Sequence, residues 1–128
     1  MKLLLDTHTA LWHMSNSQNL PNHLHQLIGE PTNQIFISQA SIIEISIKLS
    51  LGKLTIPGDW HDMLYYFERG GWNILSISNQ SLFTLSKLPF FHGDPFDRII
   101  ACQCIHQKLS LISKDIIFDK YSVSRIWE

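Results

Sequence analysis

Short apolar runs alternate along the whole chain with longer segments that carry helical signals, and this alternation limits the possible folds more than any other feature. The runs predict strands at residues 2–5, 34–38, 73–77, 109–113 and 122–127. The segments between them predict helices at residues 7–14, 21–28, 40–51, 60–69, 79–88 and 95–108, with a short helical turn at 115–120. Strands separated by helices usually pair in parallel, so we expect an α/β layered fold with a mostly parallel sheet of about five strands.

Composition and charge narrow the class of protein. The 128 residues suit a single domain, and 45% hydrophobic with 16% charged residues is the balance of a compact globular chain. No apolar run approaches the ~20 residues of a membrane span, and the leucines at 3–5 are too few for an export signal, so we expect a cytoplasmic protein without membrane contact. Because the net charge is −1, a polyanionic substrate would need positive charge from another source, such as a metal ion.

The acidic residues are placed unevenly. Of the eleven, six fall in polar turns or on exposed helix faces, namely Glu30, Asp59, Asp62, Glu68, Asp119 and Glu128. Asp6 directly follows the first predicted strand, and Asp115 follows the fourth with one residue between. Glu44 lies early in the helix after the second strand, and Asp97 lies in the first turn of its helix. The carboxyl ends of parallel strands meet at one edge of a sheet, so these acids are expected to share a cleft there.

Carboxylates that share a cleft favour binding of a metal ion there. Carboxylates in apolar surroundings are costly unless paired or bound to a metal, and several together repel one another. A divalent cation removes both problems, and oxygen ligands suit Mg²⁺ or Mn²⁺ rather than zinc. One or two such ions can hold a phosphodiester and activate a water, so the pattern favours a metal-dependent phosphodiesterase.

Each acid also has a structural interpretation. Asp6 and Asp115 can cap the helical segments that follow them, and Asp94 before Pro95 is a typical N-cap. Asp97 can be the acid of a capping pair, whereas Glu44 has no structural role beyond pairing with a lysine one turn on. Sequence alone leaves both interpretations open for each residue, and the joint placement at one edge favours the site.

Four segments resemble the PIN-domain family, specifically the VapC-type toxins of bacterial toxin–antitoxin pairs. They are LLLDTHTALWH at 3–13, SQASIIEISIKLSLGKL at 38–54, HGDPFDRIIACQ at 92–103 and LISKD at 111–115. The resemblance implies one PIN-like domain over 1–128, a three-layer α/β/α sandwich, and a Mg²⁺- or Mn²⁺-dependent endoribonuclease. The implied partners are RNA as substrate, a cognate antitoxin protein, a second copy of the chain, and operator DNA only indirectly through the antitoxin.

Matched residue by residue, the resemblance assigns the catalytic acids as Asp6, Glu44, Asp97 and Asp115. Three of them, Asp6, Asp97 and Asp115, are expected to bind the metal directly, and Glu44 through water. The auxiliary positions are Asp94, where this branch often has an extra acid, and the small hydroxyl residues Thr7 and Ser113. Arg98 can pair with Asp94 or with a phosphate, and His92 can contact substrate.

Two other functions remain open. A phosphatase with an aspartyl nucleophile also has an acid after its first strand, but it usually needs a second acid two residues later, where this chain has His8. A non-catalytic module that binds metal and antitoxin would keep the same acids without cleaving RNA.

Overall fold

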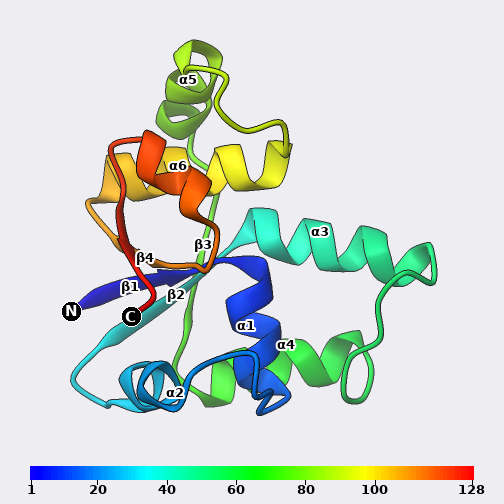
Figure 1. The fold of residues 1–128 in the computed structure, drawn as a ribbon. Coiled ribbons are helices and arrows are strands. Elements are labelled where there is room, and N and C mark those ends of the chain that lie inside the picture. Colours follow the sequence, from blue (N-terminus) through cyan, green and yellow to red (C-terminus); the bar gives the residue numbers. More distant parts are fainter.

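The computed structural model describes residues 1–128, with a five-stranded sheet through the centre (Figure 1). All four strand pairs are parallel, in the order β3-β2-β1-β4-β5. The strands are β1 (Lys2–Leu5), β2 (Gln34–Ser38), β3 (Asn73–Leu75), β4 (Ser110–Ile112) and β5 (Ser124–Ile126). The helices are α1 (Thr7–Met14), α2 (Asn22–Gly29), α3 (Gln39–Ser50), α4 (Trp60–Arg69), α5 (Asn79–Lys87) and α6 (Pro95–Gln107), with a 3-10 helix η1 (Ile116–Lys120). The predicted α/β fold with a parallel sheet is confirmed.

Helices cover both faces of the sheet. Successive residues of a strand point to opposite faces, so the leucines of β1 place apolar side chains on both. Leu3 and Leu5 of β1 pack into a hydrophobic cluster with residues of α1, α2, α3 and α4. Leu4 packs into a second cluster with residues of α6 and η1. In Figure 1, α1, α2 and α4 lie below the sheet, and α5 and α6 lie above it. Burial on both faces explains why the central strand β1 has three leucines in succession. None of the helices has both the length and the apolar character that a membrane crossing requires.

The strand order places a topological switch beside β1. From β1 the chain adds β2 and then β3 on one side, and it later adds β4 and β5 on the other. The loops that leave β1 and β4 therefore diverge at the carboxyl edge of the sheet, and open α/β sheets bind ligands in such a crevice. Asp6 and Asp115 follow these two strands.

Strand β3 ends at Leu75, earlier than the predicted end at residue 77. The carbonyls of Leu75 and Ser76 both accept hydrogen bonds from the Gln103 amide nitrogen at 3.3 Å. The amide oxygen of Gln103 in turn accepts from the Ser38 hydroxyl at 2.5 Å. A buried side chain of α6 thus binds the end of the strand, a contact that the local sequence of the strand does not reveal.

We expect Gln103→Leu to destabilise the fold by about 1–3 kcal/mol, because it leaves the Ser38 hydroxyl and two strand-end carbonyls without their buried partner. Urea unfolding followed by circular dichroism measures the loss. Gln107→Leu is the matched control, since Gln107 is exposed on the same helix. Equal unfolding midpoints for the two variants would contradict the role given to Gln103.

Candidate active site

Asp6 and Asp115 stand beside the switch point, and Ser113 connects them. The Ser113 hydroxyl donates to Oδ2 of Asp6 at 2.5 Å and accepts from the backbone N–H of Asp115 at 3.1 Å. Burial raises the pKa of Asp6, although the hydrogen bonds from Ser113 and Thr9 act in the opposite direction. Two predicted site acids from opposite ends of the chain are therefore joined through one buried hydroxyl.

Asp97 reaches the same place from the first turn of α6. Its pKa rises to about 7, chiefly because the carboxyl is partly buried. The negative charges of Asp94, Asp6 and Glu44 contribute to the rise. A carboxyl with this pKa takes up a proton, or attracts a cation, at neutral pH.

Glu44 joins the group from α3. Its side chain is buried, and its Oε2 lies 2.8 Å from the Lys48 ammonium one turn further on. The hydrogen bond to Glu44 raises the pKa of Lys48. The structure therefore contains the lysine pair expected for Glu44, and its charge also contributes to the raised pKa of Asp97.

Three acids at this edge cap helices as well. Oδ1 of Asp6 accepts the Thr9 backbone N–H at 2.8 Å, and Oδ1 of Asp115 accepts that of Ile117 at 3.0 Å. Asp94 caps α6 in the same way. For Asp6 and Asp115 the cap uses one carboxylate oxygen and leaves Oδ2 turned toward Ser113 or His92. The structural and functional interpretations of these acids are thus compatible.

His92 lies between two of the acids. Its Nε2 is 3.0 Å from Oδ2 of Asp97 and 3.2 Å from Oδ2 of Asp115. These three atoms all fall within 4.8 Å of one another, a spacing that would suit ligands of one ion. Sequence reasoning considered only a substrate contact for His92. The sequence does contain one indication of this role. His92 lies two residues before the N-cap Asp94, and a side chain at that position can reach back to the start of the helix.

The remaining auxiliary residues have other partners. The Thr7 hydroxyl donates to Ser41 at 2.9 Å rather than to an acid. The buried Arg98 guanidinium donates to the carbonyls of Leu88 and Pro89 at 3.2 and 3.1 Å and lies over the ring of Phe90. The guanidinium of Arg98 thus holds the loop before α6 and forms no ion pair with Asp94.

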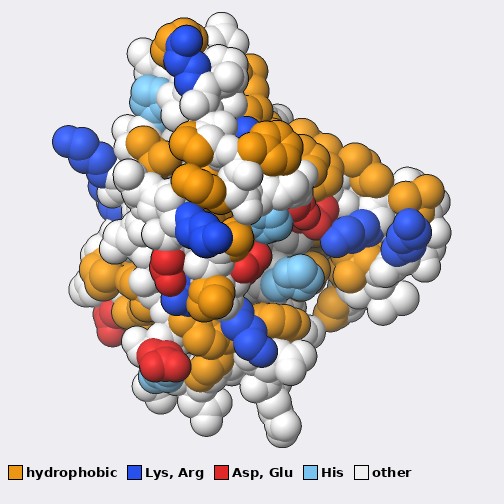
Figure 2. Space-filling view, turned by 45° about the horizontal axis from the view of Figure 1, so that its top comes forward, with side chains coloured by type: hydrophobic (Ala, Val, Ile, Leu, Met, Phe, Trp, Pro, Cys, Tyr) orange, Lys and Arg blue, Asp and Glu red, His pale blue; other side chains and the backbone are white.

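A cavity of about 230 Å³ adjoins the acids, lined by Asp6, His8, Trp12, Lys114 and Asp115. Figure 2 shows acidic and histidine side chains gathered in a hollow on one face, with hydrophobic side chains around them and Lys or Arg side chains on both sides. Asp6 and Asp115 therefore border an opening to solvent that also presents the Lys114 ammonium.

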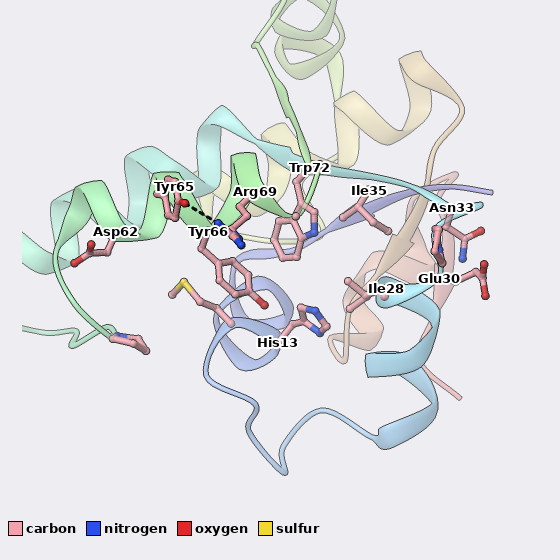
Figure 3. Close-up of a pocket in the computed structure, with 16 residues that line it drawn as sticks. His13, Ile28, Glu30, Asn33, Ile35, Asp62, Tyr65, Tyr66, Arg69 and Trp72 are labelled. Atoms are coloured by element: carbon pink, nitrogen blue, oxygen red, sulfur yellow. Dashed lines mark hydrogen bonds between the residues drawn. The ribbon is translucent and has the colours of Figure 1, made fainter.

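A larger cavity, about 810 Å³, lies elsewhere, between α4 and the segment from α1 to the start of β2. Figure 3 shows Tyr66, Trp72 and His13 directed into it, with Asp62 near one end and Glu30 near the other. It contains none of the four clustered acids, so it is a separate surface.

Comparison with known proteins places the chain in a family. The model of the PIN domain matches residues 3–123. No curated protein sequence matches the chain. Similar solved structures include a chain of VapBC2 from Rickettsia felis bound to a promoter DNA fragment (19% identity, TM-score 0.74, 100% of both chains covered). Others are DNA-bound VapBC from Salmonella typhimurium (16%, 0.69, 98% of this chain and 97% of that one) and VapBC-1 from nontypeable Haemophilus influenzae (18%, 0.66, 98% and 97%). At these identities the structures share the fold, and the family match over nearly the whole chain shows that this protein belongs to the PIN domain family.

Proposed function

We propose that this protein is a Mg²⁺- or Mn²⁺-dependent endoribonuclease that acts as the toxin of a toxin–antitoxin pair. The main support is the gathering of Asp6, Glu44, Asp97 and Asp115 at one edge of the sheet, where the pKa of Asp97 is raised to about 7. Such a cluster is costly unless a cation or protons neutralise it. A nuclease site that holds a metal ion would use the neutralising cation for chemistry.

The donor atoms fit such an ion. Carboxylate oxygens are hard ligands of the kind that Mg²⁺ and Mn²⁺ prefer. Asp6, Asp97 and Asp115 would hold the ion directly. Glu44, with Oε2 already held by Lys48 at 2.8 Å, would act through a water.

A bound ion of this kind would hold the scissile phosphate, lower the pKa of a water and stabilise the leaving oxygen. The side chains of the protein provide position and local charge. Ser113 fixes the orientation of Asp6, and Lys48 offsets the charge of Glu44. Lys114 is exposed beside Asp115 and can contact the RNA backbone, which a chain with a net charge of −1 cannot attract by its overall charge.

The family and its structural neighbours support the partners. PIN domains are generally nucleases, and the similar structures named above are toxin–antitoxin assemblies, two of them with DNA. We infer that this chain binds an antitoxin protein and a second copy of itself, and that it meets operator DNA only through the antitoxin. The cavity of Figure 3 could receive a segment of a partner protein, because Tyr66 and Trp72 line it and Asp62 and Glu30 lie near its two ends.

Asp97→Asn removes a direct ligand of the proposed ion and is expected to lower RNA cleavage in Mg²⁺ or Mn²⁺ by more than about 100-fold. Glu44→Gln removes an outer partner that acts through a water, and such a loss typically costs about 10–100-fold. Cleavage of total RNA by the purified chain, mapped by sequencing, measures the effect.

The control is Glu68→Gln, which makes the same chemical change on an exposed face of α4 and should cleave like the wild type. Cleavage that persists with a chelator in the Asp97→Asn variant would contradict the proposal. A wild-type chain that binds the ion and an antitoxin but cuts no RNA would favour the non-catalytic module. A covalent phosphate on Asp6 would favour the phosphatase, although both oxygens of Asp6 already accept hydrogen bonds.

We expect Mg²⁺ to raise the melting temperature more at pH 8 than at pH 5.5. Because the pKa of Asp97 is raised from 3.8 to about 7 in the folded chain, ionising it costs folding stability as the pH rises through this window. The ion relieves that cost at pH 8, whereas at pH 5.5 it must first displace a proton. Differential scanning fluorimetry at constant ionic strength measures both shifts.

The Asp97→Asn variant is the control for this pH dependence, because its amide does not titrate. Its Mg²⁺-induced shift should be small and nearly equal at the two pH values. Equal shifts in the wild-type protein would show that Asp97 does not exchange a proton for the ion.

A further inference from the structure

Helix α4 shows how a pair of acids at the start of a helix forms a capping box. Asp59 is its N-cap and Asp62 its third residue, and the two form a complete capping box. Oδ1 of Asp59 accepts the Asp62 N–H at 2.9 Å, and Oδ2 of Asp62 accepts the Asp59 N–H at 2.8 Å. The third-residue carboxylate is thus turned back onto the chain and used for the cap.

Helix α6 has the same pair at the same spacing but only half of the box. Oδ1 of Asp94 accepts the Asp97 N–H at 3.2 Å, as in α4. The Asp94 N–H, however, donates to Nδ1 of His92 at 3.2 Å rather than to Asp97. His92 therefore takes the place of the third-residue carboxylate, and the side chain of Asp97 remains turned toward the other acids.

This contact also decides what the opposite nitrogen of His92 can do. A backbone N–H can only donate, so Nδ1 must carry a lone pair and Nε2 carries the proton of the neutral ring. Nε2 lies 3.0 Å from Oδ2 of Asp97 and donates to Oδ2 of Asp115 at 3.2 Å. To bind a metal through Nε2, the ring would have to give up its hydrogen bond with Asp94.

The position of His92 is fixed from both sides of the loop. Its backbone N–H donates to the Tyr121 hydroxyl at 3.0 Å, and its ring meets Phe118 edge-on at 6.2 Å. At the other end of the loop, Arg98 binds the carbonyls of Leu88 and Pro89. Such support is what holds a side chain in one orientation at a functional site.

We propose that His92 is a positioning residue of the proposed metal site, which frees Asp97 from the capping box with one nitrogen and holds Asp97 and Asp115 together with the other. The inference rests on the proposed function and assigns His92 to the partners around the ion rather than to its ligands. Without the histidine ring, Asp97 would turn back to the Asp94 N–H, as Asp62 does in α4.

Isothermal titration of the full chain with Mn²⁺ and with Mg²⁺ tests this role without measuring catalysis. His92→Phe keeps the ring and its packing but has no nitrogen, and we expect it to weaken binding of both ions by about 10–100-fold. The loss should be the same factor for each ion, because a hydrogen-bond donor does not distinguish them. His92→Gln, which retains an N–H and an acceptor, should recover most of the affinity, and the exposed His106→Phe should bind like the wild type.

The affinities of the variants also distinguish a positioning residue from a metal ligand. Unchanged affinities in His92→Phe, with cleavage by the wild type intact, would overturn the positioning role and leave the proposed function standing. A larger loss for Mn²⁺ than for Mg²⁺ would make His92 a nitrogen ligand, since nitrogen favours the transition metal. If His92→Phe fails to fold by circular dichroism, the His92→Gln affinities decide, and a weakening of more than about 100-fold there would also overturn the role. A wild-type chain that binds neither ion would remove the metal site and the inference together.

Discussion

The close approach of several carboxylates is the constraint around which this edge of the molecule is organised. The sheet topology brings Asp6 and Asp115 together at the switch point, and α3 and α6 add Glu44 and Asp97. The fold offsets part of the repulsion with hydrogen bonds from helix N-termini, from Ser113 and from Lys48. The pKa of Asp97 nevertheless stays raised, chiefly because its carboxyl is partly buried and in addition because Asp94, Asp6 and Glu44 are negatively charged. A divalent cation would neutralise these charges.

The same hydrogen bonds explain why structure and chemistry cannot be separated at these residues. Asp6 and Asp115 each use one oxygen to begin a helical segment and keep the other for the site. Asparagine preserves the cap while it removes the charge, whereas alanine removes both. An alanine variant would therefore confuse a loss of helix capping with a loss of catalysis, and amide variants isolate the charge.

Sequence reasoning reached the sheet, its parallel pairing and the acids at the strand ends because those features depend on local patterns. Asp6 and Asp115 directly follow or nearly follow apolar runs, and parallel strands bring such positions to one edge. It missed features that depend on contacts between distant segments. Three such features can be seen only in the folded chain. His92 replaces Asp97 in the capping box, Arg98 holds a loop, and Gln103 binds the carbonyl at the early end of β3. The large groove near α4 was missed for the same reason, because its walls come from separate parts of the sequence.

The location of a bound ion tests the proposed metal site most directly. Anomalous X-ray diffraction from crystals soaked in Mn²⁺ would reveal it without relying on turnover. We expect one or two peaks within coordination distance of Asp6, Asp97 and Asp115, with Glu44 further away and His92 hydrogen-bonded to the carboxylates rather than bound to the metal. Manganese bound only elsewhere on the surface, with these side chains unchanged, would contradict it.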